Sequence, residues 1–146
     1  MSTAQNIVTE ARTWLGTRFH HQARIKGVGC DCLGLVVGVV DQLQLRNAAG
    51  ELLSSFDEVN YSRLPDGAYL TEKLAALLHE VPFEEMLPGD LALFDIKGNP
   101  QHLAILTDYE ASIGMIHCFA PAHRVVEHRL DDEWKSKLVK VYRWHL

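Results

Sequence analysis

Two thiols, Cys30 and Cys32, stand one residue apart in the stretch GVGCDCLGLVVGVV, residues 27–40. The pattern predicts a helix from about Cys32 to Leu43 with Asp31 as its N-cap, because an Asp side chain accepts hydrogen bonds from the first N–H groups of a helix. Cys32 then lies in the first turn, where those groups and the helix dipole stabilise a thiolate and lower the pKa of a cysteine. We therefore expect Cys32 to be a nucleophile and Cys30, on the preceding loop, to be inert.

A nucleophilic thiol needs a base, and the base needs a third group that orients its ring. His102 begins the apolar run HLAIL, and His117 lies within the later run IGMIHCF. If the two runs form a hairpin centred between Tyr109 and Glu110, His102 lies directly opposite His117, with their Cβ atoms about 5 Å apart. A shift of one residue would turn His117 to the other face of the sheet. The pair is the predicted base and orienting residue.

The elements that must position these residues are helices first and strands afterwards. An amphipathic helix is expected over residues 3–15, a loop over 17–29, and an irregular connection over 44–67, followed by a helix from about Tyr69 to His79. This order favours an α+β fold with an antiparallel sheet. The predicted strands are LALFD at 91–95, HLAIL at 102–106, IGMIHCF at 113–119, RVVEHRL at 124–130 and LVKVYRW at 138–144.

Composition narrows the class of protein. The 146 residues, 47% of them hydrophobic and 23% charged, are typical of one globular domain over residues 1–146. A net charge of −5 gives no broad basic field, so no nucleic-acid partner is expected. The start MSTAQNIVTEARTW lacks the pattern of a secretory signal, and the longest apolar block, Leu35 to Val40, is too short to cross a bilayer. We expect cytoplasmic synthesis, no membrane insertion and free thiols.

Four motifs in order, DCLGL at 31–35, PGDLALF at 88–94, HLAIL at 102–106 and MIHCF at 115–119, resemble those of NlpC-type cell-wall cysteine peptidases. The similarity covers nearly the whole chain and is greatest to the version encoded with phage tail and gene-transfer-agent modules. It implies a papain-like NlpC fold, with N-terminal helices packed on a five- to six-stranded antiparallel sheet. It also implies hydrolysis of amide bonds in peptidoglycan stem peptides, often between γ-D-glutamate and the diamino acid.

The resemblance assigns catalytic roles residue by residue. Cys32 matches the nucleophile, His102 the general base and His117 the orienting residue, in agreement with the hairpin argument. Asp31 matches a residue that holds a substrate amino group, although helix capping alone would explain it. The implied partners are stem peptides and phage tail proteins, and the implied place of action is the cell wall, reached within a virion or after lysis.

One departure from the family concerns substrate binding. Where family members commonly carry a tyrosine, this chain has Phe19, so that hydroxyl is missing. His21 or Gln22 could supply the missing donor. Gly34, with the other glycines near the thiols, allows the backbone to approach a substrate or to turn tightly into the helix.

Other readings of the same residues remain open. The cysteines and nearby histidines could bind zinc, but a spacing of one residue differs from the two to four usual in structural zinc sites, so neither a metal nor another cofactor is expected. The glycines fit neither common nucleotide-binding pattern. Lipid acyltransferases related to papain carry the histidine before the cysteine, the reverse of the order here. The remaining alternative is a non-catalytic wall-binding or tail-assembly module on the same fold.

Overall fold

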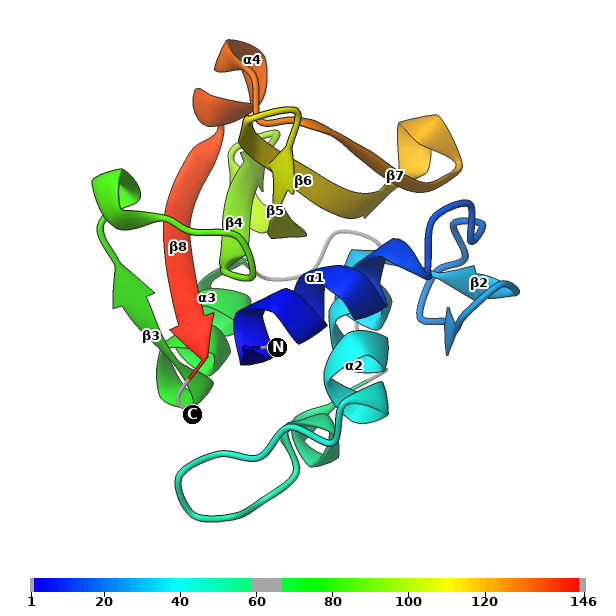
Figure 1. The fold of residues 1–146 in the computed structure, drawn as a ribbon, viewed down its shortest axis with the longest axis vertical. Helices are drawn as coiled ribbons and strands as arrows, with labels where there is room; N and C mark the ends of the chain where they lie inside the picture. The colour runs from blue at the N-terminus through cyan, green and yellow to red at the C-terminus, as the bar shows by residue number, and fades with distance from the viewer. Residues whose placement is uncertain (1, 59–66, 145–146) are drawn as a thin grey trace.

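The computed structural model describes residues 2–58 and 67–144. Helices α1 (Thr3–Arg12), α2 (Cys32–Gln42) and α3 (Gly67–Leu77) lie against an antiparallel sheet with the strand order β3-β8-β4-β5-β6-β7 (Figure 1). The expected α+β architecture is therefore confirmed. The strands of this sheet are β3 (Leu78–Val81), β4 (Leu91–Ile96), β5 (Asn99–Tyr109), β6 (Ser112–Phe119), β7 (Arg124–Arg129) and β8 (Leu138–Trp144).

Side-chain caps begin the first two helices. Ser2 and Gln5 exchange hydrogen bonds in a capping box at the start of α1, with the Gln5 N–H donating to Ser2 Oγ at 3.2 Å. Asp31 caps α2 as predicted, because its Oδ1 accepts a hydrogen bond from the Gly34 N–H at 2.7 Å. This cap places Cys32 at the first helical position.

Several short elements differ from the sequence-based expectation. The loop over 17–29 contains strand β1 (Arg24–Ile25), which pairs with β2 (Gly29–Cys30). The predicted helix from Tyr69 to His79 ends at Leu77, since Leu78–Val81 forms β3 against β8, a long-range pairing that local pattern does not reveal. The connection over 44–67 includes the 3-10 helix η1 (Leu53–Phe56), and its residues 59–66 lie outside the described part.

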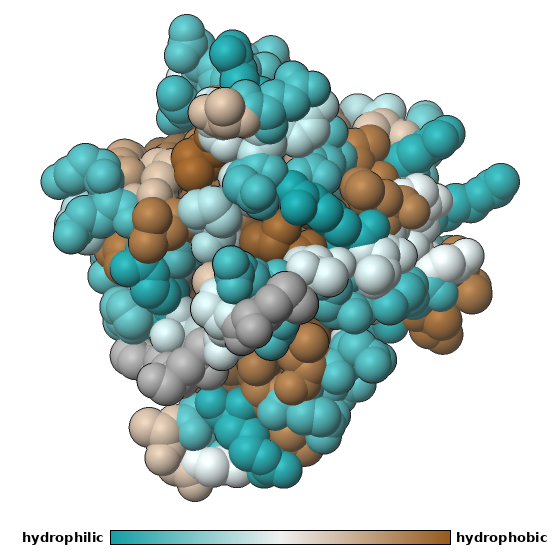
Figure 2. Space-filling view, viewed as in Figure 1, coloured by the Kyte–Doolittle hydropathy of each residue, from teal (hydrophilic) through white to brown (hydrophobic). Residues whose placement is uncertain are grey.

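Alternating side chains of the sheet build two separate apolar cores. In β5, Leu103 and Ile105 face α1 and α2, whereas Ala104 and Leu106 face the other side. The short helix α4 (Asp132–Lys135) covers that second side with Trp134. On the outer surface apolar side chains form small patches among hydrophilic ones, one of them near the β1–β2 hairpin, where Ile25 is exposed (Figure 2).

The hairpin between β5 and β6 has a different register from the predicted one. Tyr109 pairs with Ser112, and the two turn residues Glu110 and Ala111 have φ values of 47° and 62°, as in a type I′ turn. The predicted centre between Tyr109 and Glu110 was wrong by one position, which shifts the pairing by two residues. The sequence Glu-Ala carries none of the Asn-Gly signal of such turns. Because the shift is even, side chains keep their predicted faces.

The two strands of this hairpin separate toward its open end. Their pairing extends only to Ile105 opposite Ile116, although β5 reaches back to Asn99 and β6 continues to Phe119, paired there with β7. Backbone groups at the start of β5 are therefore left for other partners. The N-terminus of α2 meets the sheet at this point.

Candidate functional site

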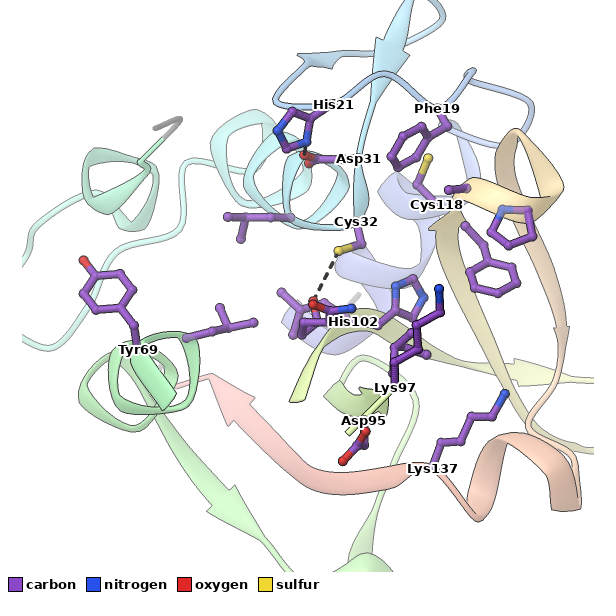
Figure 3. A pocket seen from close by; sticks show the side chains of 18 of the residues that line it. Phe19, His21, Asp31, Cys32, Tyr69, Asp95, Lys97, His102, Cys118 and Lys137 are labelled. Carbon is purple, nitrogen blue, oxygen red and sulfur yellow. Dashed lines mark hydrogen bonds and ion pairs between the residues drawn. The ribbon is translucent and has the colours of Figure 1, made fainter. Parts of the chain in front are cut away.

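A cavity of about 950 Å³ lies where α2 meets the start of β5 (Figure 3). Its size is typical of sites for small ligands. Residues of the predicted site that line it are Phe19, His21, Asp31, Cys32 and His102. The remaining lining residues are Leu33, Glu58, Tyr69, Leu70, Lys73, Asp95, Ile96, Lys97, Gln101, Leu103, Cys118, Phe119, Ala120, Pro121 and Lys137.

The sulfur of Cys32 occupies the position between β5 and β6 where the pairing has stopped. Its S–H donates to the Gln101 carbonyl oxygen at 3.8 Å, and the sulfur accepts from the N–H groups of Leu103 and Leu33. Burial, and then the charge of Asp31, raise the pKa of the Cys32 thiol to about 12. The predicted lowering of this pKa was wrong, because desolvation and the adjacent carboxylate outweigh the N–H donors. The resting group is a neutral thiol.

Three histidines form a hydrogen-bonded chain beside the thiol. His102 Nε2 lies 2.7 Å from His117 Nδ1, and His117 Nε2 lies 2.8 Å from His128 Nε2. His128 Nδ1 lies 2.8 Å from the carbonyl oxygen of Arg129. The predicted contact of His102 with His117 is present, but the two residues are diagonal neighbours and not directly opposite. His128 was not singled out in the sequence, although it stands in the predicted strand 124–130.

Burial keeps the two inner imidazoles neutral. It lowers the pKa of His102 to about 4, with a smaller contribution from Lys137. It lowers the pKa of His117 to about 2, helped by the neighbouring His102 and His128. At neutral pH both rings are therefore uncharged bases.

An aromatic side chain packs over the whole histidine chain. The centroid of the Trp134 ring lies 5.6 Å from that of His102, 4.9 Å from that of His117 and 6.1 Å from that of His128. Asp131 caps the short helix α4 by accepting from the Trp134 N–H at 3.0 Å. Helix α4 has four residues, too few for a periodic pattern, and was therefore not predicted from the sequence.

Cys32 and His102 face one cavity but are not bonded to each other. Within the described residues, the sulfur makes its contacts with the backbone on either side of His102 and makes no hydrogen bond with an imidazole nitrogen. His102 Nε2 is taken by His117, so Nδ1 is the nitrogen left for a proton from the thiol.

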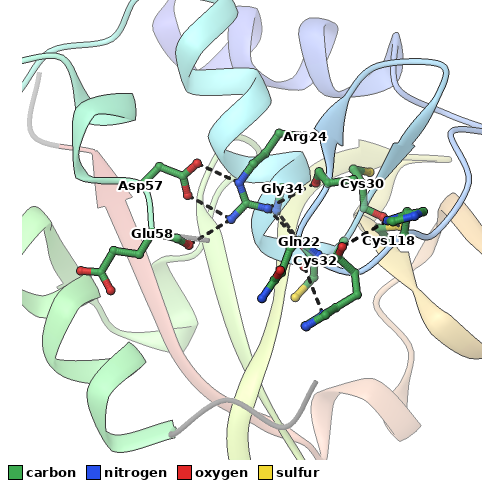
Figure 4. A network of polar contacts seen from close by, with 12 residues as sticks. Gln22, Arg24, Cys30, Cys32, Gly34, Asp57, Glu58 and Cys118 are labelled. Atoms are coloured by element: carbon green, nitrogen blue, oxygen red, sulfur yellow. Dashed lines mark hydrogen bonds and ion pairs between the residues drawn. The ribbon is translucent and has the colours of Figure 1, made fainter. Parts of the chain in front are cut away.

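Asp31 contacts Gln22, Arg24 and Gly34 at the start of α2. Figure 4 shows these three partners within a wider polar network. Its Oδ2 accepts from the Gln22 N–H at 2.8 Å, and its Oδ1 lies 3.3 Å from Arg24 Nη1. Arg24 also donates to both carboxylate oxygens of Asp57, at 2.8 and 3.0 Å. Gln22 therefore supports Asp31 through its backbone, which has a φ of 65°.

The other predicted binding residues have different surroundings. Gly34 does not line the cavity, and a side chain there would overlap the Ala23 carbonyl oxygen, so close packing explains this glycine. Phe19 lies beside Cys118 at the cavity wall (Figure 3). His21 Nδ1 is 3.9 Å from Asp31 Oδ2.

Metal-binding clusters and membrane-spanning helices are both absent from the described part of the chain. No group of three or more His, Cys, Asp or Glu residues is arranged there to hold a metal ion. None of its helices has the length and apolar character needed to span a membrane. The cysteines Cys30, Cys32 and Cys118 are all free thiols, and Cys118 donates to the Cys30 carbonyl oxygen at 3.1 Å.

No family model and no curated protein matches the sequence. Solved structures are similar: a lipoprotein-like NLP/P60 family protein from Staphylococcus aureus shares 19% identity over 99% of this chain, with a TM-score of 0.67. The NlpC/p60 domain of the peptidoglycan hydrolase SagA shares 18% identity over 97%, with a TM-score of 0.61. The peptidoglycan hydrolase RipB from Mycobacterium tuberculosis shares 20% over 96%, with a TM-score of 0.59.

This chain covers very different fractions of the lengths of these three proteins. The chain spans 42% of the Staphylococcus aureus protein, 99% of the SagA domain and 63% of RipB. At these identities the similarity establishes architecture, whereas the subgroup encoded with phage tails stays a prediction. The chain has the NlpC/P60 fold, as the motifs predicted.

Proposed function

We propose that this protein is a cysteine endopeptidase that cleaves amide bonds in peptidoglycan stem peptides. The observation that carries the proposal is the shared cavity of Cys32 and His102, with His102 held by His117 at 2.7 Å. This arrangement supplies a thiol at a helix start, a neutral base and an orienting group. The fold, which solved peptidoglycan hydrolases share, gives it additional support.

The proposed reaction begins from neutral partners. Substrate binding moves the Cys32 sulfur away from Gln101, and His102 Nδ1 takes the thiol proton as the sulfur attacks the carbonyl carbon. Backbone N–H groups at the start of α2 stabilise the resulting oxyanion. His102 returns the proton to the departing amine, and water then hydrolyses the thioester. His117 keeps the base in position throughout.

The charges around the cavity support a peptide substrate that carries both acidic and amino groups. Lys97 and Lys137 line the wall near Asp95 (Figure 3). Lys73 and Glu58, which form an ion pair at 3.3 Å, also line the cavity. Stem peptides have carboxylates and a free amine that match such a mixed lining. The bond that we propose for cleavage joins γ-D-glutamate to the diamino acid, as the resemblance of the motifs implies.

The biological setting is proposed from the same resemblance. We infer a protein that is made in the cytoplasm, associates with phage tail proteins and reaches the cell wall within a virion or after lysis. The second candidate function is a non-catalytic wall-binding or tail-assembly module, which the missing hydroxyl at Phe19 and the raised pKa of Cys32 favour. That module would bind stem peptides and leave them intact.

Mass spectrometry of digests of defined muropeptides tests the proposal and identifies the bond. The wild-type protein is expected to cut, and Cys32→Ala to lose at least about 10³-fold in rate because no other group replaces the nucleophile. Cys30→Ala is the matched control, since Cys30 is a fully buried core thiol, and should retain cleavage. Equal cleavage by Cys32→Ala would refute the assignment. Binding without cleavage by the wild type would favour the module.

A further inference from the structure

We propose that His128 is a positioning residue that sets the proton arrangement of the base, and that protonation of His128 reverses this arrangement. In the resting arrangement His128 keeps His102 Nδ1 free of a proton. In the reversed arrangement that nitrogen carries one. The catalytic meaning of this inference rests on the proposed function, whereas the hydrogen-bond arrangement itself does not.

The three histidines lie on one diagonal line across neighbouring strands. His117 on β6 is opposite Val126 on β7, and Met115 is opposite His128, so His117 and His128 share a face and are offset by two residues. Extension of the register at Ile105 and Ile116 gives His102 on β5 the same two-residue offset from His117. Diagonal neighbours on one face are within reach of ring side chains. The observed separations of 2.7 and 2.8 Å make each contact a hydrogen bond.

The carbonyl oxygen of Arg129 determines the direction of every bond in the chain. A carbonyl only accepts, so His128 Nδ1 must carry a hydrogen. In a neutral His128 the other nitrogen, Nε2, then accepts from the His117 Nε2–H. His117 Nδ1 in turn accepts from the His102 Nε2–H. The remaining nitrogen of His102, Nδ1, has a free electron pair and can take a thiol proton.

One added proton at His128 changes all three rings. A cationic His128 carries hydrogens on both nitrogens, so its Nε2 donates to His117 Nε2. Neutral His117 then carries its hydrogen on Nδ1 and donates to His102 Nε2. Neutral His102 must carry its hydrogen on Nδ1, where it cannot accept one from Cys32. Hydrogens are conserved within the inner rings, and the one extra proton comes from solvent at His128.

Exposure makes His128 the entry point for that proton. His117 is fully buried and His102 is 7% exposed, whereas His128 is only partly buried. Burial lowers the pKa values of both inner rings and so disfavours a charge there. The rings of Phe94, Phe119 and Trp134 pack against the histidine chain. The charged group of Lys137 lies on the same side, with its Nζ 4.8 Å from the Trp134 ring centroid. Lys137 further lowers the pKa of His102.

Nitrogen NMR of isotope-labelled histidines tests the arrangement without any need for activity. The wild type should show hydrogens on His102 Nε2, His117 Nε2 and His128 Nδ1 at neutral pH. His128→Gln should preserve the first two, because its amide oxygen can accept from His117 Nε2. His128→Leu removes that acceptor and should leave a mixture of tautomers at His102 and His117. Unchanged tautomers in His128→Leu would overturn the proposal.

Kinetics with muropeptides supply the second readout. His128→Leu should lower kcat about 10-fold with little change in KM, and His128→Gln should restore most of the loss. In the wild type kcat/KM should fall as acid protonates His128, and in His128→Gln this fall should move to lower pH. An acid limb that is identical in both proteins would overturn the reversal.

The two readouts separate this inference from the proposed function. If the protein shows the predicted tautomers but cleaves no muropeptide, the peptidase assignment is refuted and the proposed hydrogen-bond arrangement of the three histidines is retained. A protein that cleaves muropeptides but has unaltered tautomers in His128→Leu would support the peptidase assignment and refute the proposed role of His128. His79→Leu, on the exposed edge strand β3, is the matched control and should behave as wild type. Circular dichroism of each variant checks that the fold is retained.

Discussion

The two faces of the central sheet contribute different parts of the candidate site. The face under α1 and α2 is apolar and brings a thiol to the sheet at the helix start. The opposite face carries the histidine chain beneath Trp134. They meet at the beginning of β5, where Gln101 and Leu103 contact the sulfur and His102, between them, points to the other core. Consecutive residues of β5 thus contact the thiol on one face and the histidine chain on the other. Continued pairing of β5 with β6 would keep these two groups apart.

The separation of β5 from β6 is as important to the site as the residue types. If the pairing continued past Ile105 and Ile116, strand β6 would occupy the backbone groups that now hold Cys32. Substitutions on one face of the sheet should therefore have different measurable effects from substitutions on the other face.

Among variants of the second face, the largest effect is expected from removal of the base. His102→Ala should reduce kcat/KM by about 10²- to 10⁴-fold, the usual contribution of general acid–base catalysis. His117→Ala should cost less, about 10- to 100-fold, because it removes a buried hydrogen bond of about 1–3 kcal/mol and leaves the base present. Steady-state kinetics on muropeptides measures both. Equal losses would show that orientation of the ring matters as much as its presence.

Acid should destabilise the second face before carboxylates titrate. The pKa values of His102 and His117 lie at about 4 and 2 in the folded protein, against 6.5 for an ordinary histidine. Below pH 6.5 the unfolded chain therefore binds more protons than the folded one, and the free energy of unfolding falls as pH falls through this window. Each histidine contributes roughly 1.4 kcal/mol per pH unit well below its unfolded pKa.

Urea unfolding between about pH 7 and pH 5 measures this slope. His117→Gln should remove one of the two titrations and halve it, which makes this variant the control. A free energy of unfolding that stays constant over that range would contradict neutral burial of the two rings.

The smallest effect is expected on the face of the sheet that α2 covers. Asp31→Asn should lower the pKa of Cys32, since the carboxylate is the second cause of its elevation. Ultraviolet absorbance of the thiolate against pH, in a background without Cys30 and Cys118, measures the change. Asp57→Asn removes the other partner of Arg24 and should leave the pKa of Cys32 where it was. A shift of equal size in both variants would point to a rearranged network and not to the charge of Asp31.

Local sequence rules predicted what local contacts determine. The cap at Asp31 and the position of Cys32 follow from short-range hydrogen bonding, and the five predicted strands follow from alternation of apolar residues. The shared face of His102 and His117 was predictable, because side chains alternate between the two faces of a strand and an error of two residues in the register leaves each on its predicted face. The turn at Glu110 and Ala111 itself was not, since neither residue favours a positive φ.

Features that depend on distant contacts could not be predicted in this way. The pairing of β3 with β8 and the position of Trp134 over the histidines require knowledge of which surfaces meet. The elevated pKa of Cys32 likewise depends on burial by a neighbouring strand, which no helix rule contains. The position of His128 could have been predicted, because a strand with alternating side chains placed beside β6 puts His128 on the same face as His117.

The contact of Cys32 with the backbone of β5 ties the chemical state of the sulfur to the strand that carries His102. Any acylation or alkylation of the sulfur takes away the proton given to Gln101 and weakens the acceptor used by Leu103. The amide of Leu103 then becomes a reporter inside the backbone, whose hydrogen exchange records whether the thiol is occupied.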